Sequence, residues 1–196
     1  MQINLKPTEV LLKEVRLSYV NLISPSKGAY SEGDDKYRVT FLLPKNDAKA
    51  KADIDAAIKE AYSLGVTKKW GGSRPAMKHP VYDGDGPRPS GEMFGEECRG
   101  HWVFTGSSNT QPEVVDAAGA KLIEPGQPVQ RPSEVYSGMY VSALVNFYAY
   151  NNNGNRGIAC GLGPMKKRRD GEPLGGAQPK ASQVFDFDPA DDPLFG

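Results

Sequence analysis

Apolar and polar side chains along this chain mostly alternate with a period of two residues, the spacing that predicts β-strands. Residues 10–22 and 36–43 both follow this pattern. In the second segment, a polar and basic face lies opposite an apolar face made of Tyr37, Val39, Phe41 and Leu43. In the first segment, the same alternation assigns one face to Leu11, Val15, Leu17 and Tyr19. We therefore predict two strands that each turn one face toward a core.

Strand patterns return in the second half of the chain. Residues 101–106 predict a strand, and residues 112–124 predict a hairpin that turns at Ala118 and Gly119. The longest pattern spans 134–150, where an unbroken apolar face lies opposite a second face with Tyr136, Tyr140, Ser142, Asn146, Tyr148 and Tyr150. A tight turn at 151–154 and a strand over 156–162 then complete a terminal hairpin.

One helix interrupts the strands. Asn46 is the expected N-terminal cap, apolar residues recur at helical spacing from Ala50 to Ala61, and Gly65 is the expected end. From there to about Gly100 the chain is rich in Gly and Pro, which predicts a long insertion without regular structure. Long loops often carry function, so this insertion is of interest.

Five or six short strands, one helix and a long terminal hairpin favour a mainly β fold, an OB-type Greek-key barrel with a loop-rich insertion. The 196 residues, with 22 Gly and 16 Pro, suffice for one such domain plus extensions. We expect the domain to span 1–165. A basic, Gly/Pro-rich linker at 166–182 and a disordered acidic tail at 183–196 are expected to follow.

Charge is distributed unevenly along the chain. The 24 basic and 24 acidic residues cancel, but the tail alone holds four aspartates, so 24 basic and 20 acidic residues remain in the body, a net charge of +4. A basic body favours a polyanionic partner. An acidic tail with an apolar tip is typical of a docking segment for other proteins, or of a competitor for a basic groove. The predicted partner-binding residues are Asp191, Asp192, Leu194 and Phe195.

An OB barrel with basic and aromatic side chains on its surface is a common host for single-stranded nucleic acid. We predict that tyrosines stack on bases and that basic residues follow the phosphates. The alternatives are that the tyrosines are only good strand formers and that the charges are only solvated surface. The candidate contacts are Arg16, Lys36, Arg38, Tyr136, Tyr140, Tyr148, Tyr150, Lys166, Lys167, Arg168 and Arg169.

Several segments together resemble the OB-fold single-stranded-DNA-binding protein family of tailed phages. They include VRLSYVNL, PVYDGDGPRPSG, GHWVFTGSSNTQPEVVD and, most specifically, YSGMYV followed by a turn and GIACGLG. The resemblance implies sequence-independent binding of single-stranded DNA during phage replication or recombination, with replication or recombination proteins as further partners of the tail. It also implies a location in the cytoplasm of the bacterial host, and a homodimer stays open.

Other chemistries fit the sequence less well. No catalytic motif or cofactor signature is present, so we expect a protein that is not an enzyme and needs no cofactor. One alternative is a metal-dependent nucleic-acid-processing protein that uses carboxylates of the 71–97 insertion, and another is a phage structural protein. Zinc binding by cysteine and histidine is disfavoured by irregular spacing. The candidate ligands of a divalent ion are Asp83, Asp85, Glu96 and Glu97. The candidate ligands of zinc are His79, Cys98, His101 and Cys160.

Neither a secretion signal nor an apolar run of about 20 residues, the length that a membrane span needs, occurs in the sequence. The protein is therefore expected in the cytosol. In that compartment its two cysteines, Cys98 and Cys160, are expected to stay reduced.

Overall fold

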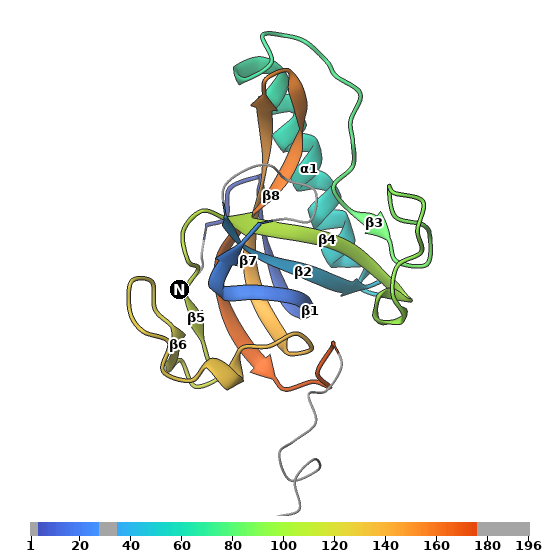
Figure 1. Ribbon diagram of the computed structural model, residues 1–196. Coiled ribbons are helices and arrows are strands. Elements are labelled where there is room, and N and C mark those ends of the chain that lie inside the picture. Colours follow the sequence, from blue (N-terminus) through green and yellow to red (C-terminus); the bar gives the residue numbers. More distant parts are fainter. Residues whose placement is uncertain (1–3, 28–34, 176–196) are drawn as a thin grey trace, which may run out of the picture.

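The strands of the computed structural model, which describes residues 4–27 and 35–175, curl into a closed barrel (Figure 1). They are β1 (Glu9–Ser26), β2 (Lys36–Pro44), β3 (Tyr82–Asp83), β4 (His101–Ser108), β5 (Val114–Val115), β6 (Lys121–Ile123), β7 (Tyr140–Asn152) and β8 (Asn155–Arg169). Antiparallel ladders join β1 to β2 and β7, β2 to β4, and β7 to β8. A short parallel pairing of β4 with β8 closes the ring of five strands. The predicted OB-type barrel is thereby confirmed.

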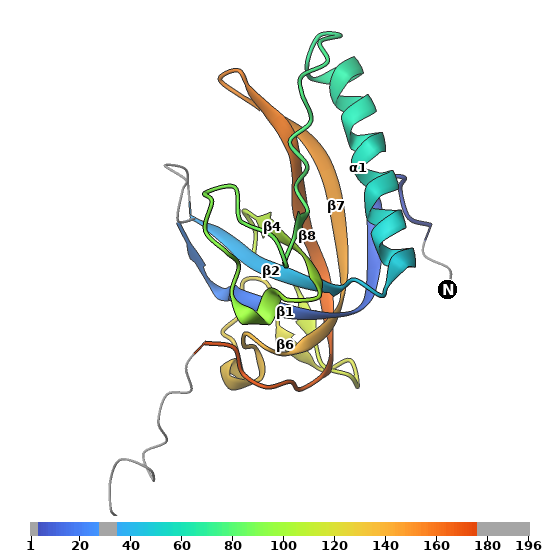
Figure 2. The same ribbon diagram turned by 90° about the vertical axis from the view of Figure 1, so that its right-hand side faces the viewer.

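The elements outside the ring lie at its ends and on its surface. Helix α1 (Ala48–Lys68) runs beside the β7–β8 hairpin, which extends well beyond the barrel (Figure 2). The small hairpin of β5 and β6 forms as predicted, with Asp116 accepting hydrogen bonds from the N–H groups of Ala118 and Ala120 in its turn. Two single 3-10 turns are η1 (Glu96–Cys98) and η2 (Pro132–Glu134). No described helix is long and apolar enough to cross a membrane.

The core forms where the apolar faces of the strands meet inside the barrel. On β7, every second side chain from Val141 to Phe147 is buried, as the alternation predicts. The ring of Phe104 lies 5.0 Å from that of Phe41 and 6.2 Å from that of Phe147, measured between centroids. These contacts tie β2, β4 and β7 together through the centre of the barrel.

The face prediction for β1 is half wrong. Val15 and Leu17 are buried as expected, but Leu11 is 46% exposed and Tyr19 is 60% exposed. The register of β1 shifts between Leu12 and Val15 against β7, and again between Ser18 and Asn21 against β2. Each irregularity changes the phase of the alternation, so a constant period of two cannot hold along the strand.

Helix α1 begins one residue later and ends three residues later than predicted. Asp47, not Asn46, is the N-terminal cap, because its carboxylate accepts a hydrogen bond from the N–H of Ala50 at 3.0 Å. At the other end the helix continues through Gly65 to Lys68. A Cβ on Gly65 would lie only 2.6 Å from the Cβ of Ala149, so this glycine serves the close packing of α1 on β7 rather than the helix end.

The terminal hairpin has different bounds from those predicted. β7 begins at Tyr140, not at residue 134, because the chain first makes the η2 turn and then passes through Gly138 with φ at +117°. A side chain at Gly138 would also clash with the backbone of Glu172. β8 continues to Arg169, so the basic cluster 166–169 is part of the sheet and not of a linker.

The insertion is anchored to the barrel through its middle part, at residues 82–85. β3 pairs with β4, placing Tyr82 opposite Val103. Lys45 at the end of β2 donates hydrogen bonds to Asp83 at 2.5 Å and to Asp85 at 2.6 Å. These contacts hold the insertion against the barrel surface beside β2 and β4 (Figure 2).

Candidate nucleic-acid interface

A cleft of about 1060 Å³ lies between the outer surface of the barrel and the insertion. The end of β1 and the outward face of β2 and β4 contribute Tyr19, Arg38 and Thr105 to its lining. The insertion contributes the segment around Arg88, and the β7–β8 hairpin contributes Tyr150. The cleft is thus bounded by parts of the chain that are far apart in sequence.

The charges that line the cleft all have one sign. Its described lining residues include four basic side chains and no Asp or Glu; the basic ones are Lys27, Arg38, Lys78 and Arg88. A concave surface with charges of one sign concentrates counter-ions of the opposite sign. The cleft therefore favours a polyanion such as a phosphate backbone.

Aromatic rings stand beside these charges. Tyr82 is 38% exposed, and its ring centroid lies 6.4 Å from that of Phe94. The guanidinium of Arg88 lies 5.1 Å from the centroid of Phe94, a cation–π contact that supports both side chains. With Tyr19, Tyr150 and the buried Phe104, five aromatic residues line the cleft, and four of them lie outside the core. Aromatic faces next to basic groups are what a single strand needs, because its bases are free to stack.

The register of β2 explains why Arg38 reaches the cleft. Val39 and Phe41 are fully buried, so Arg38 and Thr40, which alternate with them, point outward. Arg38 lies opposite Ser107 of β4, and Thr40 lies opposite Thr105, with 3.3 Å between the two threonine hydroxyls. The floor of the cleft is therefore polar and basic, as the alternation over 36–43 predicts.

The carboxylates that anchor the insertion, Asp83 and Asp85, are bound by Lys45 and are not arranged as metal ligands. The hydrogen bond from Lys45 holds the pKa of both Asp83 and Asp85 below the ordinary value of 3.8. Asp85 also accepts a hydrogen bond from the N–H of Gly100 at 2.9 Å. Glu96 forms an ion pair with Arg99 at 2.8 Å. A lysine thus occupies the position between the two aspartates that a cation would need.

The residues proposed for zinc do not assemble either. Within residues 4–27 and 35–175, no three His, Cys, Asp or Glu side chains gather as metal ligands would. His79 lies 3.5 Å from Asp55 of α1, while His101 contacts the backbone oxygen of Arg99. Cys98 and Cys160 are both buried and unpaired with each other.

Two of the predicted DNA contacts, Arg38 and Tyr150, line the cleft, and the other nine do not. Arg16 donates hydrogen bonds to the backbone oxygens of Gly138 and Glu172, at 3.3 and 2.7 Å. Lys36 starts β2 opposite Ser26. Neither Arg16 nor Lys36 is a lining residue of the cleft, although Ser26, the partner of Lys36, is one.

Tyr140 and Arg169 are engaged with each other. The guanidinium of Arg169 lies 3.5 Å from the centre of the Tyr140 ring and donates to Glu14 at 2.6 Å. Arg16 lies 5.8 Å from the centre of the same ring. One face of Tyr140 is thus already covered by a protein side chain.

The four residues of the basic cluster 166–169 point in different directions because they lie in a strand. Lys167 is 5% exposed and forms ion pairs with Glu134 at 2.6 Å and Asp170 at 2.8 Å. Its ammonium group also lies 5.3 Å from the centre of the Tyr136 ring. Lys166 and Arg168 point to the opposite, solvent-facing side. The cluster is therefore not one continuous basic patch.

Tyr148 lies on the outer face of the β7–β8 hairpin and is 38% exposed. A Cβ on Gly161 would meet its ring at 3.5 Å, so the ring lies over this glycine of β8. Partial burial raises the pKa of its hydroxyl above the ordinary value of 10.0. Tyr148 remains a predicted contact outside the cleft.

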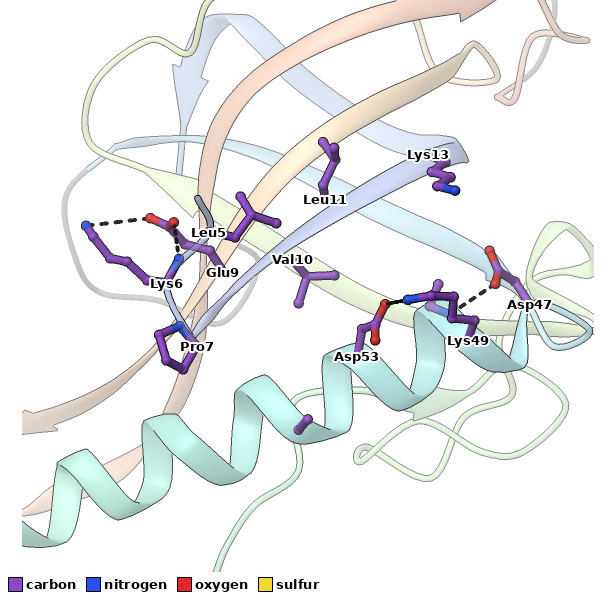
Figure 3. Close-up of a pocket in the computed structure, with 12 residues that line it drawn as sticks. Leu5, Lys6, Pro7, Glu9, Val10, Leu11, Lys13, Asp47, Lys49 and Asp53 are labelled. Carbon is purple, nitrogen blue, oxygen red and sulfur yellow. Dashed lines mark hydrogen bonds and ion pairs between the residues drawn. The ribbon is translucent and has the colours of Figure 1, made fainter. Parts of the chain in front are cut away.

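A second groove of about 510 Å³ runs between the start of β1 and α1 (Figure 3). Lys6 forms an ion pair with Glu9 at 3.6 Å, and Lys49 forms one with Asp53 at 2.6 Å. Because these charges cancel, the groove lacks the excess positive charge of the cleft. The cleft is therefore the better candidate for a nucleic acid.

Sequence patterns missed most of the cleft. Apart from the buried Phe104, its remaining basic and aromatic residues lie in the insertion or within residues 19–27, where no strand period identifies a face. The only available signal was the general tendency of long loops to carry function. The missed residues are Tyr19, Lys27, Lys78, Tyr82, Arg88 and Phe94.

Comparison with known proteins identifies the family of the chain. The sequence model of the family described as Enterobacter phage Enc34, ssDNA-binding protein, matches residues 8–195. The chain belongs to this family. A further relative, putative protein p50 of Acyrthosiphon pisum secondary endosymbiont phage 1, is 29% identical over 189 residues, which is 91% of this chain and 92% of the relative. The resemblance found in the sequence is therefore confirmed.

Two solved structures of phage proteins have folds similar to that of this chain. The single-stranded DNA-binding protein from bacteriophage Enc34 in complex with ssDNA has a TM-score of 0.71 and 29% identity, covering 87% of this chain and 91% of that chain. The single-stranded DNA-binding protein gp2.5 encoded by bacteriophage T7 has a TM-score of 0.56 over 91% of this chain and 95% of that chain. Its identity is only 14%, so this second likeness concerns the fold alone.

Proposed function

We propose that this protein binds single-stranded DNA in the cleft between the barrel and the insertion, without preference for base sequence. One observation carries the proposal: the described cleft residues include four cations, four aromatic rings besides the buried Phe104, and no carboxylate. Phosphates are attracted by the cations, and exposed bases stack on the rings. Duplex DNA hides its bases inside the stack, so it offers the rings nothing to bind.

The family supports the same proposal. A relative of similar length and fold is the Enc34 single-stranded DNA-binding protein, whose structure has been solved in complex with ssDNA. We further propose that the present protein covers and protects single strands during phage DNA replication or recombination, in the cytoplasm of the bacterial host. Such a role needs no catalytic group, in keeping with the use of the insertion carboxylates for anchoring.

The acidic tail is proposed to regulate binding and to recruit other proteins. The predicted docking residues Asp191, Asp192, Leu194 and Phe195 lie outside the described residues. The described chain leads toward the cleft: Leu174 packs, as Phe94 does, against the cluster that contains Cys98 and Val103, and Phe94, Cys98 and Val103 all line the cleft. An acidic segment attached there is held at high effective concentration next to the cations of the cleft.

Deleting residues 186–196 tests the tail. The truncated protein is expected to bind single-stranded DNA more tightly, because the internal competitor has been removed, and to lose capture of replication or recombination proteins. DNA affinity is measured by fluorescence anisotropy, and capture by pull-down with the full chain as control. Unchanged DNA affinity and unchanged capture together would refute both roles of the tail.

The direct test of the proposed function is a fluorescence-anisotropy titration of labelled oligo(dT) and mixed-sequence single strands, with duplex DNA as competitor. We expect similar affinities for both single strands, weak competition by duplex, and weaker binding as salt rises. Absence of binding to any single strand at low salt would overturn the proposal.

A further inference from the structure

One residue of the cleft has a strained backbone. Among the described residues other than glycine, only Tyr19 and Asn153 have a positive φ, at 46° and 50°. Asn153 lies in the tight turn between β7 and β8, where asparagine tolerates the left-handed conformation. In both residues the Cβ crowds the following carbonyl oxygen, but tyrosine lacks the short polar side chain that lets asparagine form a compensating local hydrogen bond. Such strain persists only where the surrounding structure enforces it, and it is concentrated at functional sites.

The strain arises from a bulge in β1. Ser18 lies opposite Thr40 and Asn21 lies opposite Arg38, so three steps along β1 match two steps along β2. This count is that of a bulge with one extra residue. The N–H of Val20 donates instead to the hydroxyl of Ser137 at 3.0 Å. The segment before β7 therefore helps to hold the bulge in place.

The bulge reverses the direction of the Tyr19 side chain. Val15 and Leu17 are fully buried, and the unbroken alternation would turn Tyr19 into the core beside them. With the bulge, Tyr19 is 60% exposed and lines the cleft. Its hydroxyl makes no hydrogen bond to any described residue, and its ring contacts no described ring or cation. Among the described residues, the ring of Tyr19 therefore has no polar or aromatic partner that would account for its outward position.

We propose that Tyr19 is a base-stacking residue on the barrel side of the cleft and that the strained bulge serves to present its ring. The inference rests on the proposed function, because it supposes a single strand in the cleft. An exposed aromatic ring among cations, held outward at a cost in backbone strain, matches what base stacking requires. Neither Phe94 nor Tyr82 supplies this on the barrel side, because both belong to the insertion.

The test compares three variants for DNA affinity and thermal stability. Tyr19→Gly removes the ring and also relieves the strain, because glycine adopts positive φ readily. We expect its melting temperature to equal or exceed that of the wild type, while its affinity for oligo(dT) falls about 5- to 150-fold, the equivalent of about 1–3 kcal/mol for one stacked base. Tyr19→Phe keeps the ring and should bind like the wild type.

The matched control is Ile23→Ala, which removes an exposed apolar side chain of the same strand outside the cleft and should leave affinity unchanged. The loss in Tyr19→Gly should leave the salt dependence of binding unaltered, because tyrosine neutralises no phosphate. Wild-type affinity in Tyr19→Gly, or equal loss of stability and binding, would overturn the inference while leaving the proposed function intact. Failure of the wild type to bind single strands would instead refute the proposed function.

Discussion

Removing one charge from the cleft is expected to change how steeply DNA affinity falls with salt. Each cation that neutralises a phosphate of a single strand contributes about 0.7 to the slope of log affinity against log salt concentration. The four cations of the cleft therefore predict a slope of about −2.8. Between about 50 and 200 mM salt, this slope corresponds to a loss of affinity of about 50-fold.

Lys78→Ala is the simplest test of the predicted slope. Lys78 is exposed and forms no ion pair with a described residue, so its removal should not affect folding. The slope is expected to become about −2.1, which reduces the loss over the same salt range to about 20-fold. The measurement is anisotropy of labelled oligo(dT) at a series of salt concentrations.

The matched control is Lys13→Ala, because Lys13 lines the groove beside α1 and not the cleft (Figure 3). Its slope should equal that of the wild type. A normal slope in Lys78→Ala together with a reduced slope in Lys13→Ala would refute the reasoning. The DNA would then follow the α1 side of the molecule.

The contacts of Asp83 and Asp85 with Lys45, which hold the insertion on the barrel, should weaken in acid. Hydrogen bonds from Lys45 lower the pKa of both carboxyl groups. Their contribution to the stability of the insertion is therefore complete above the ordinary pKa of 3.8 and is lost as the pH falls through the lowered pKa. Pepsin should therefore spare the insertion of the wild type at about pH 4 and cleave it at about pH 2, and it should cleave the insertion of Lys45→Met at both values. Identical cleavage of the wild type and Lys45→Met at about pH 4 would show that Lys45 does not hold the insertion in place. Burial raises the pKa of the thiols to about 11 for Cys98 and about 12 for Cys160, so neither should react with an alkylating reagent near neutral pH until the protein is unfolded. Rapid labelling of the folded protein would contradict their burial.

The sequence predicts the barrel well because each long strand buries one face and exposes the other. On β2 this alternation correctly separates Arg38 from Val39 and Phe41. On β7 it correctly separates the buried Phe147 from the exposed Tyr148. Where hydrophobic burial alone decides the face of a side chain, residue order is a sufficient guide.

The remaining features depend on backbone irregularity or on distant contacts. Nothing in the residues around Tyr19 marks the bulge, because tyrosine is an ordinary strand residue and glycine is absent there. Lys167 was predicted on phosphates, yet it forms ion pairs with Glu134 and Asp170 on the inner side of β8. Such a pairing can be recognised only when the register of β8 is known. The DNA contacts proposed outside the cleft, such as Tyr148, remain predictions.

The parallel pairing of β4 with β8 determines when the barrel can close during synthesis. The seam consists of Gly106 opposite Cys160 and Ser107 opposite Gly161, so it joins the middle of the chain to its last strand. A ribosome delivers the chain from its N-terminus, and unpaired strand edges promote association between chains. The emerging protein therefore carries an open barrel until β8 is released. Translation that stops before β8 leaves the part of β4 around Gly106 and Ser107 as an exposed edge to which a neighbouring nascent chain can add.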